Sequence, residues 1–99
     1  MPARIQFIKS PRENTVRLLT RRMHPDAQKN ILGKKWGAVG LVQDHLPNLF
    51  AMADIASKQA NVVVEEVRGT CPQHITMMAI FGDTASVRAA LDSIEAMAK

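Results

Sequence analysis

Cys71 and His74 are the residues of this chain whose types and spacing are best suited to chemistry. They lie in the segment Arg68-Gly69-Thr70-Cys71-Pro72-Gln73-His74, between two predicted strands. A thiolate is a soft ligand for iron–sulfur clusters, zinc or copper. The Cys-x-x-His spacing supplies only two of the four ligands of a zinc site. Cys71 is the only cysteine, so a metal site or a disulfide built on it requires that symmetry bring several copies together.

An isolated loop cysteine is by default a small hydrophobic residue or an inert thiol at a turn. Gly69 permits such a turn and Pro72 fixes the backbone after the thiol, but a Cys-Pro dipeptide is a weak cluster signal. Hydrolase chemistry would need His24, His45 or His74 as a base, and no oxyanion-hole motif accompanies them. The sequence also has no phosphate-binding glycine loop, paired carboxylates or HExxH motif. Nothing in it supports an enzyme.

The composition predicts one soluble domain. Ninety-nine residues suffice for a single core, and 46% hydrophobic with 22% charged residues is ordinary for a folded protein. Aromatic residues make up only 4%, so the core must be built from Val, Ile, Leu, Ala and Met. The apolar runs are too short for a membrane span, the start does not resemble a signal peptide, and one cysteine excludes an intrachain disulfide framework. We therefore expect a cytoplasmic protein.

The net charge of +4 and the sequence pI of about 9.7 raise the question of nucleic-acid binding. The basic residues are interleaved with Leu and Met rather than with exposed aromatics. This pattern favours a solvated or subunit-contacting face, with nucleic acid or an acidic partner as the minority interpretation. The basic residues lie mostly early in the chain, at Arg17, Arg21, Arg22, Lys29, Lys34 and Lys35.

The first third of the chain contains one ambiguous segment. Residues 4–8 alternate enough to predict a short strand, and 25–32, ended by Gly33, predict a short helix. Between them, Ser10 as N-cap, Pro11 and Glu13 fit the start of a helix. However, the branched residues of 15–21 fit a strand equally well. Local rules leave both alternatives open.

From Gly37 onward the pattern predicts β-α-β-β-α. Residues 37–42 are a short apolar run whose glycines suit a strand closely approached by another element. The final helix is capped by Asp83. The fold class is therefore α+β, an antiparallel sheet with helices packed on one face. Two further strands are predicted over 62–68 and 74–81, the second with Ile75, Met77, Ala79 and Phe81 on one face and Thr76, Met78 and Ile80 on the other. A helix is predicted over 47–60, with Leu49, Ala53, Ala56 and Ala60 on one face. The final helix has its apolar positions at Val87, Leu91, Ile94 and Ala98.

Three segments from Gly37 onward resemble the bacterial microcompartment (BMC) shell domain. Residues 37–42 are similar to that family's opening strand. Residues 52–62, Met-Ala-Asp-Ile-Ala-Ser-Lys-Gln-Ala-Asn-Val, resemble its first helix and the strand that follows. Residues 81–91 resemble the Gly-Asp-x-x-x-Val-x-x-Ala start of its second helix. The matches occur in the family's order and, from Trp36 to the end, cover roughly two-thirds of the chain.

Most members of this family have a further strand after the second helix, whereas here strand-like sequence precedes Trp36. This resembles the circularly permuted members, and most closely the GrpU type associated with glycyl-radical propanediol microcompartments. The resemblance implies a single shell domain over 1–99. In it, 1–36 would supply permuted N-terminal strands, with 15–21 as one of them, and a short helix, while 37–99 would form the core.

The resemblance also implies flat cyclic hexamers that tile with other shell proteins into a polyhedral shell. The loop between the second and third strands of the core would line a central pore, which places Arg68, Gly69, Thr70, Cys71, Pro72 and Gln73 there and His74 at its rim. Lys58 matches the lysine at the edge between hexamers.

In a sixfold ring, one copy of Cys71 from each subunit would converge on the axis. The hypothesis that follows is an iron–sulfur cluster, of the 4Fe-4S type, shared between subunits, with some thiols ligating and others not. Arg68 would offset its negative charge, and the cluster would transfer electrons or be delivered across the shell. The alternative is a metal-free pore that conducts small metabolites past Thr70, Gln73 and Arg68.

Overall fold

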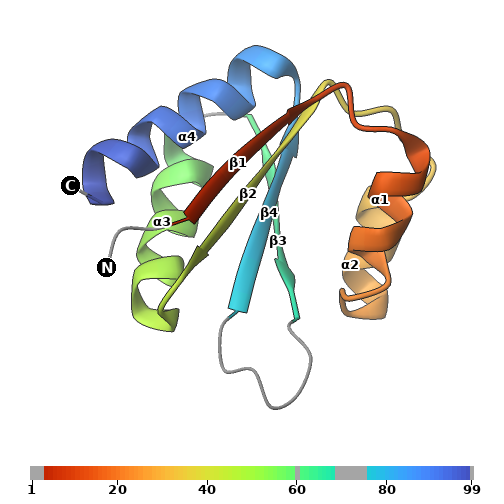
Figure 1. The fold of residues 1–99 in the computed structure, drawn as a ribbon, viewed down its shortest axis with the longest axis horizontal. Helices are drawn as coiled ribbons and strands as arrows, with labels where there is room; N and C mark the ends of the chain where they lie inside the picture. Colours follow the sequence, from red (N-terminus) through yellow and green to blue (C-terminus); the bar gives the residue numbers. More distant parts are fainter. Residues whose placement is uncertain (1–3, 60, 69–75, 99) are drawn as a thin grey trace.

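The computed structural model describes residues 4–59, 61–68 and 76–98 of the chain. Within these ranges an antiparallel sheet is flanked by helices on both sides (Figure 1). The elements in chain order are β1 (Arg4–Lys9), α1 (Glu13–Thr20), α2 (Pro25–Ile31), β2 (Ala38–Asp44), α3 (Leu46–Gln59), β3 (Val63–Val67), β4 (Thr76–Gly82) and α4 (Thr84–Ala98).

The predicted β-α-β-β-α order from Gly37 onward is confirmed. The four strands run in the spatial order β1-β2-β4-β3, and all three neighbouring pairs are antiparallel. In the register, Gly40 of β2 lies between Phe7 of β1 and Ile80 of β4. β1 and β3 are therefore the edges of the sheet. The N-terminal strand occupies an edge beside β2, as the permuted arrangement implies.

One face of the sheet packs against α3 and α4 through residues spaced as the sequence predicts. Met78 and Ile80 of β4 point to this face, where they meet apolar residues of both helices. Ile80 is completely buried. The buried members of this first cluster are Ala38, Val42, Leu49, Met52, Ala56, Met78, Ile80, Val87, Ala90, Leu91 and Ile94.

The opposite face is partly covered by α1 and α2 (Figure 1). The expectation of helices on one face therefore holds for α3 and α4, while the N-terminal helices add a second layer. Phe81 is completely buried there, and the ring of Trp36 lies 5.4 Å from it. The indole Nε1 of Trp36 donates a hydrogen bond to the Ile31 carbonyl at 3.1 Å, which satisfies its polar atom. This second cluster contains Val16, Met23, Ala27, Ile31, Val39, Val67, Ala79 and Phe81.

The strand that the resemblance implies over 15–21 is wrong, because this segment is the helix α1. Val16 and Thr20, four positions apart, are buried on one side of the helix, whereas Arg17 and Leu18 are exposed. This spacing fits a helix lying on the sheet. Arg17 also pairs with Glu13 at 3.1 Å across one helical turn.

The predicted capping role of Ser10 is also wrong. Ser10 has a left-handed φ of 51°, and its backbone N–H donates to the Gly37 carbonyl at 2.8 Å. The helix starts later, with Arg12 at the N-cap and no side-chain cap. By contrast, the predicted end of α2 is confirmed, since Gly33 follows it with a φ of 83°.

The predicted cap of α4 is confirmed by two hydrogen bonds. Asp83 Oδ1 accepts from the Ser86 backbone N–H at 2.8 Å, and Oδ2 accepts from the Ser86 hydroxyl at 2.9 Å. These bonds favour the ionised carboxylate and hold the pKa of Asp83 below its ordinary value of 3.8. A carboxylate with a lowered folded-state pKa stabilises the fold above its unfolded-state value, and this contribution is lost as pH falls through the folded-state pKa.

We expect Asp83→Ala to lower the melting temperature at neutral pH and to weaken the fall of melting temperature as pH drops below 3.8. The reason is that the variant loses both the cap and its titration. Thermal unfolding between pH 2 and 7 measures this difference. Asp92→Ala, at an exposed position of the same helix, is the matched control. Identical pH profiles for Asp83→Ala and the unaltered protein would contradict the assignment.

Candidate functional site

The predicted pore loop connects the ends of β3 and β4. Val67, the last residue of β3, is paired with Met77 of β4. Arg68 is exposed, and its backbone N–H donates to the Arg22 carbonyl at 2.9 Å, so the start of the loop is tied to the segment between α1 and α2. Residues 69–75 lie outside the described part of the chain. The roles assigned to Gly69, Thr70, Cys71, Pro72, Gln73 and His74 therefore stay predictions.

The start of α3 lies beside the first residue of β4. Asp44 lies opposite Thr76 in the register of β2 and β4. Its Oδ1 accepts hydrogen bonds from the His45 backbone N–H at 2.7 Å and from Asn48 Nδ2 at 3.3 Å. This carboxylate satisfies donors at the helix start.

His24 also has a local structural role. Its Nδ1 accepts a hydrogen bond from the Asp26 backbone N–H at 3.2 Å, which caps the start of α2. A ring nitrogen engaged in this way acts as an N-terminal cap.

The part of the chain that the structure describes holds no group of three or more His, Cys, Asp or Glu side chains able to bind a metal ion. It also contains no buried side-chain nitrogen or oxygen without a hydrogen-bond partner. A cluster at this loop therefore fits the donor set of this chain only if several copies each contribute a thiolate, since a four-iron cluster uses four.

Lys58, predicted at the edge between hexamers, lies in the last turn of α3. Its Nζ is 2.7 Å from Asp54 Oδ2, and both side chains are more than half exposed. An exposed pair of this kind contributes about 0.3–0.5 kcal/mol. The Lys58 ammonium group therefore lies at the surface, and a partner that displaced Asp54 from it would lose only this small pairing energy. The edge role itself stays a prediction.

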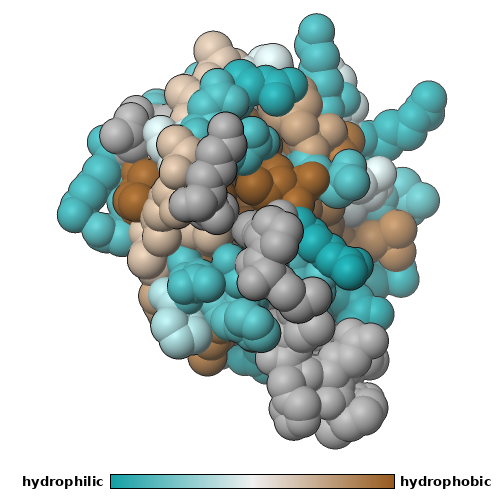
Figure 2. Space-filling model, turned by 60° about the vertical axis from the view of Figure 1, so that its left-hand side comes forward, coloured by the Kyte–Doolittle hydropathy of each residue, from teal (hydrophilic) through white to brown (hydrophobic). Residues whose placement is uncertain are grey.

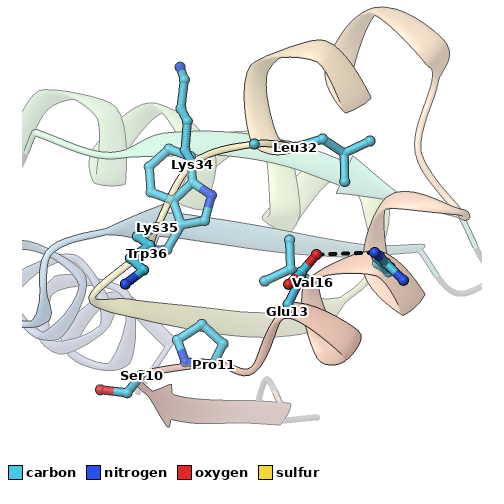
Figure 3. Close-up of a pocket in the computed structure, with 10 residues that line it drawn as sticks. Ser10, Pro11, Glu13, Val16, Leu32, Lys34, Lys35 and Trp36 are labelled. Atoms are coloured by element: carbon cyan, nitrogen blue, oxygen red, sulfur yellow. Dashed lines mark hydrogen bonds and ion pairs between the residues drawn. The ribbon is translucent and has the colours of Figure 1, made fainter.

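A hollow of about 540 Å³ lies between α1 and the segment that leads into β2 (Figure 3). Its lining includes the apolar side chains of Val16, Leu32 and Trp36 and also the Glu13–Arg17 pair. Its volume is that of a small-molecule site. Its polar groups do not converge, because the glutamate is paired with arginine, the indole N–H is bonded to backbone and the Lys34 ammonium points away from the hollow (Figure 3).

A smaller apolar groove of about 170 Å³ runs between α3 and the edge strand β3. Leu46 and Phe50 beside it are 47% and 70% exposed. Figure 2 shows the α3 and α4 side of the molecule, where hydrophobic surface occurs as patches between hydrophilic side chains. Sequence reasoning missed this groove. The available signal was Leu46 and Phe50, two large apolar residues that do not belong to the predicted stripe of this helix. The groove is lined by Leu46, Leu49, Phe50, Ala53, Val64, Glu65, Glu66, Met77 and Met78.

No helix among the described residues is long and apolar enough to cross a membrane.

Comparisons with known proteins show which family has this fold. The family model of the BMC domain matches residues 38–99, which begin at the first residue of β2. A search of curated proteins found no match to this chain. The ligand-free structure of the GrpU microcompartment shell protein from Pectobacterium wasabiae has a TM-score of 0.75 and 37% identity, covering 93% of this chain and 99% of that one. The ligand-free GrpU microcompartment shell protein from Clostridiales bacterium 1_7_47FAA has a TM-score of 0.69 and 35% identity, covering 92% of this chain and 86% of that one.

The similarity to the first of these structures extends over nearly the full length of both chains, so it also takes in most of the residues that precede the matched BMC domain. At identities above one-third, such likeness indicates common descent as well as a shared fold. The chain therefore belongs to the BMC domain family and has the structure of a GrpU-like microcompartment shell protein.

Proposed function

We propose that this protein is a structural component of a bacterial microcompartment shell, acting as a homohexamer that tiles with other shell proteins. The observation that carries the proposal is its similarity to GrpU shell proteins over almost its whole length. The GrpU resemblance extends the proposal to glycyl-radical propanediol microcompartments. The role that we propose is structural rather than enzymatic, as expected for a member of the BMC domain family.

We further propose that the loop from Arg68 to Gln73 lines the central pore and that Cys71 ligates an iron–sulfur cluster shared between subunits. The support is chemical: the chain supplies one soft ligand, and cyclic symmetry multiplies it around one axis. The antiparallel pairing of Val67 with Met77 fixes where this loop leaves the sheet. When bound, the cluster would supply one-electron chemistry; this chain would contribute the thiolate and the nearby Arg68 cation.

The assembly is tested by native mass measurement of the purified protein, together with electron microscopy of its tiled arrays. We expect a mass of about six chains of 10.9 kDa. A monomer at all concentrations would remove the support for a shell role. In that case, oligonucleotide binding that falls steeply with salt would favour a basic binding module instead.

The cluster is tested by anaerobic purification with optical absorption and iron and sulfide analysis. We expect a visible absorption band in the unaltered protein that is lost in Cys71→Ser, while the mass of the assembly is unchanged. Serine keeps the size of the side chain but replaces the soft sulfur ligand. A hexamer without iron would favour the metal-free pore that conducts metabolites. A band retained in Cys71→Ser would show that another residue is the ligand.

A further inference from the structure

We propose that Leu18 on α1 of one copy inserts into the apolar groove between α3 and β3 of the next copy, with Arg21 of the first copy beside Glu66 of the second. This inference rests on the proposed function only in requiring that copies of the chain assemble. It adds which two surfaces meet.

The groove exposes apolar side chains to water, which is energetically unfavourable. It is lined by apolar side chains of α3, β3 and β4, and Phe50 at its border is 70% exposed. Burying such apolar surface contributes about 25 cal/mol per Å². The volume of about 170 Å³ is below the 300–1,000 Å³ typical of small-molecule sites, and suits one protruding apolar side chain.

The groove also carries negative charge. Glu65 and Glu66 both line it. Glu65 Oε2 already accepts a hydrogen bond from Asn30 Nδ2 at 3.4 Å within the chain. Glu66 is exposed on the edge strand, which leaves it as the carboxylate placed to meet a cation from outside.

The matching surface is the outer side of α1. Leu18 is 55% exposed, because Val16 and Thr20 form the side of the helix that faces the sheet. Arg21 lies three positions after Leu18, one turn along the same side, and is exposed. Leu32 is less exposed at 44% and lines the larger hollow, and Met97 lies on α4, on the same side of the sheet as the groove.

Charge is distributed along the chain in a way that favours this contact. Residues 1–36, which contain α1 and α2, hold nine Lys or Arg and two Asp or Glu. Residues 37–99, which contain the groove, hold four Lys or Arg and seven Asp or Glu. Opposite charges on two interacting surfaces fix the register of docking and oppose contacts between like surfaces.

The two surfaces lie on opposite sides of the sheet, with α3 on one side and α1 on the other (Figure 1). They cannot meet within one chain. A contact between two different surfaces of identical subunits is head-to-tail, and it repeats around a ring when the rotation closes. The proposed contact therefore belongs to a ring rather than to an isolated dimer.

Charge reversal tests the contact. Glu66→Lys alone and Arg21→Glu alone are expected to raise the protein concentration at which the assembly half-dissociates by about tenfold each. The double variant is expected to return this midpoint to within about threefold of the unaltered protein. Glu95→Lys, the same change at an exposed position on α4, is the matched control and is expected to leave the midpoint unchanged.

Oxidative cross-linking gives a second measurement, made in the Cys71→Ser background. Leu18→Cys combined with Phe50→Cys is expected to form covalent multimers longer than a dimer on a denaturing gel. Leu18→Cys combined with Met97→Cys is expected to form none. Provided that Leu18→Cys alone and Phe50→Cys alone form no disulfide dimer, multimers longer than a dimer require a head-to-tail contact, since a two-fold contact between the two thiols stops at the dimer.

The failure of this inference is distinguishable from failure of the proposed function. A ring that forms normally in both single charge variants, with no ladder from the Leu18 and Phe50 cysteine pair, would overturn the contact and leave the shell role standing. A protein that is monomeric without any substitution would overturn both.

Discussion

Phe81→Ala is expected to lower the free energy of unfolding by about 3–5 kcal/mol. Phe81 lies in β4 opposite Val39 of β2 and Val63 of β3, and its side chain is completely buried. Its ring centroid lies 5.4 Å from that of Trp36 at an interplanar angle of 53°. Such an aromatic pair stabilises the fold by more than its buried apolar area alone. Truncation leaves a cavity between the sheet and the N-terminal helices. Since domains are stable by about 5–15 kcal/mol, this loss is a large share of the total.

Urea denaturation followed by circular dichroism measures the change. Phe50→Ala is the matched control, because it makes the same chemical change at a side chain that is 70% exposed. A surface substitution of this kind typically changes stability by no more than about 0.5 kcal/mol in the isolated subunit. If Phe81→Ala and Phe50→Ala cost the same, the second hydrophobic cluster would not anchor the N-terminal layer to the sheet.

The elements from Gly37 onward were predictable because local and tertiary signals agree there. The alternation of Met77, Met78, Ala79, Ile80 and Phe81 places successive side chains on opposite faces, and both faces are buried. Asp83 stops the strand and caps the next helix with the same side chain. Period, cap and burial all indicate one structure, which is the condition under which a sequence specifies its fold.

The structure of residues 11–22 was not predictable, because the local signals conflict there. Thr15 and Val16 favour a strand, while Pro11 and Glu13 favour a helix start. Packing decides between the two: Val16 belongs to the second cluster, and Val16 and Thr20 are both buried four positions apart, as helical spacing requires. The family resemblance pointed to a strand over 15–21, because it implies that the N-terminal part of the chain supplies the strand missing after the second helix of the core. In the structure β1 already fills the sheet edge beside β2.

The candidate site also has one part that the sequence predicts and another that it does not. Residue types predicted the chemistry available at Cys71, and the register of β3 and β4 defines the two strand ends on either side of residues 69–75. The surfaces that we propose to meet between copies involve Leu18, Phe50 and Glu66, which are far apart in sequence and lie on three different elements. No spacing rule connects such residues. Exposure of large apolar side chains in the folded chain is the property that reveals them.

The close approach of α4 to β2 at Gly40 is the contact from which the second large effect follows. A Cβ at this position would lie 2.9 Å and 3.0 Å from the two Cδ atoms of Leu91 and 3.1 Å from its Cγ, all shorter than ordinary van der Waals contact. Leu91 is only 1% exposed and belongs to the first cluster, so its side chain has little room to move. Gly40→Ala is therefore expected to cost about 1–3 kcal/mol through overpacking.

Leu91→Ala alone is expected to cost about 2–5 kcal/mol, because it empties buried space. In the double variant the new methyl group of residue 40 has room where the leucine was. The combined cost should therefore be smaller than the sum of the single costs by about 0.5–3 kcal/mol. Urea denaturation of the three variants measures this coupling. Leu46→Ala, at a 47% exposed position, should instead be additive with Gly40→Ala. Equal additivity for both pairs would mean that the side chain of Leu91 does not dictate glycine at position 40.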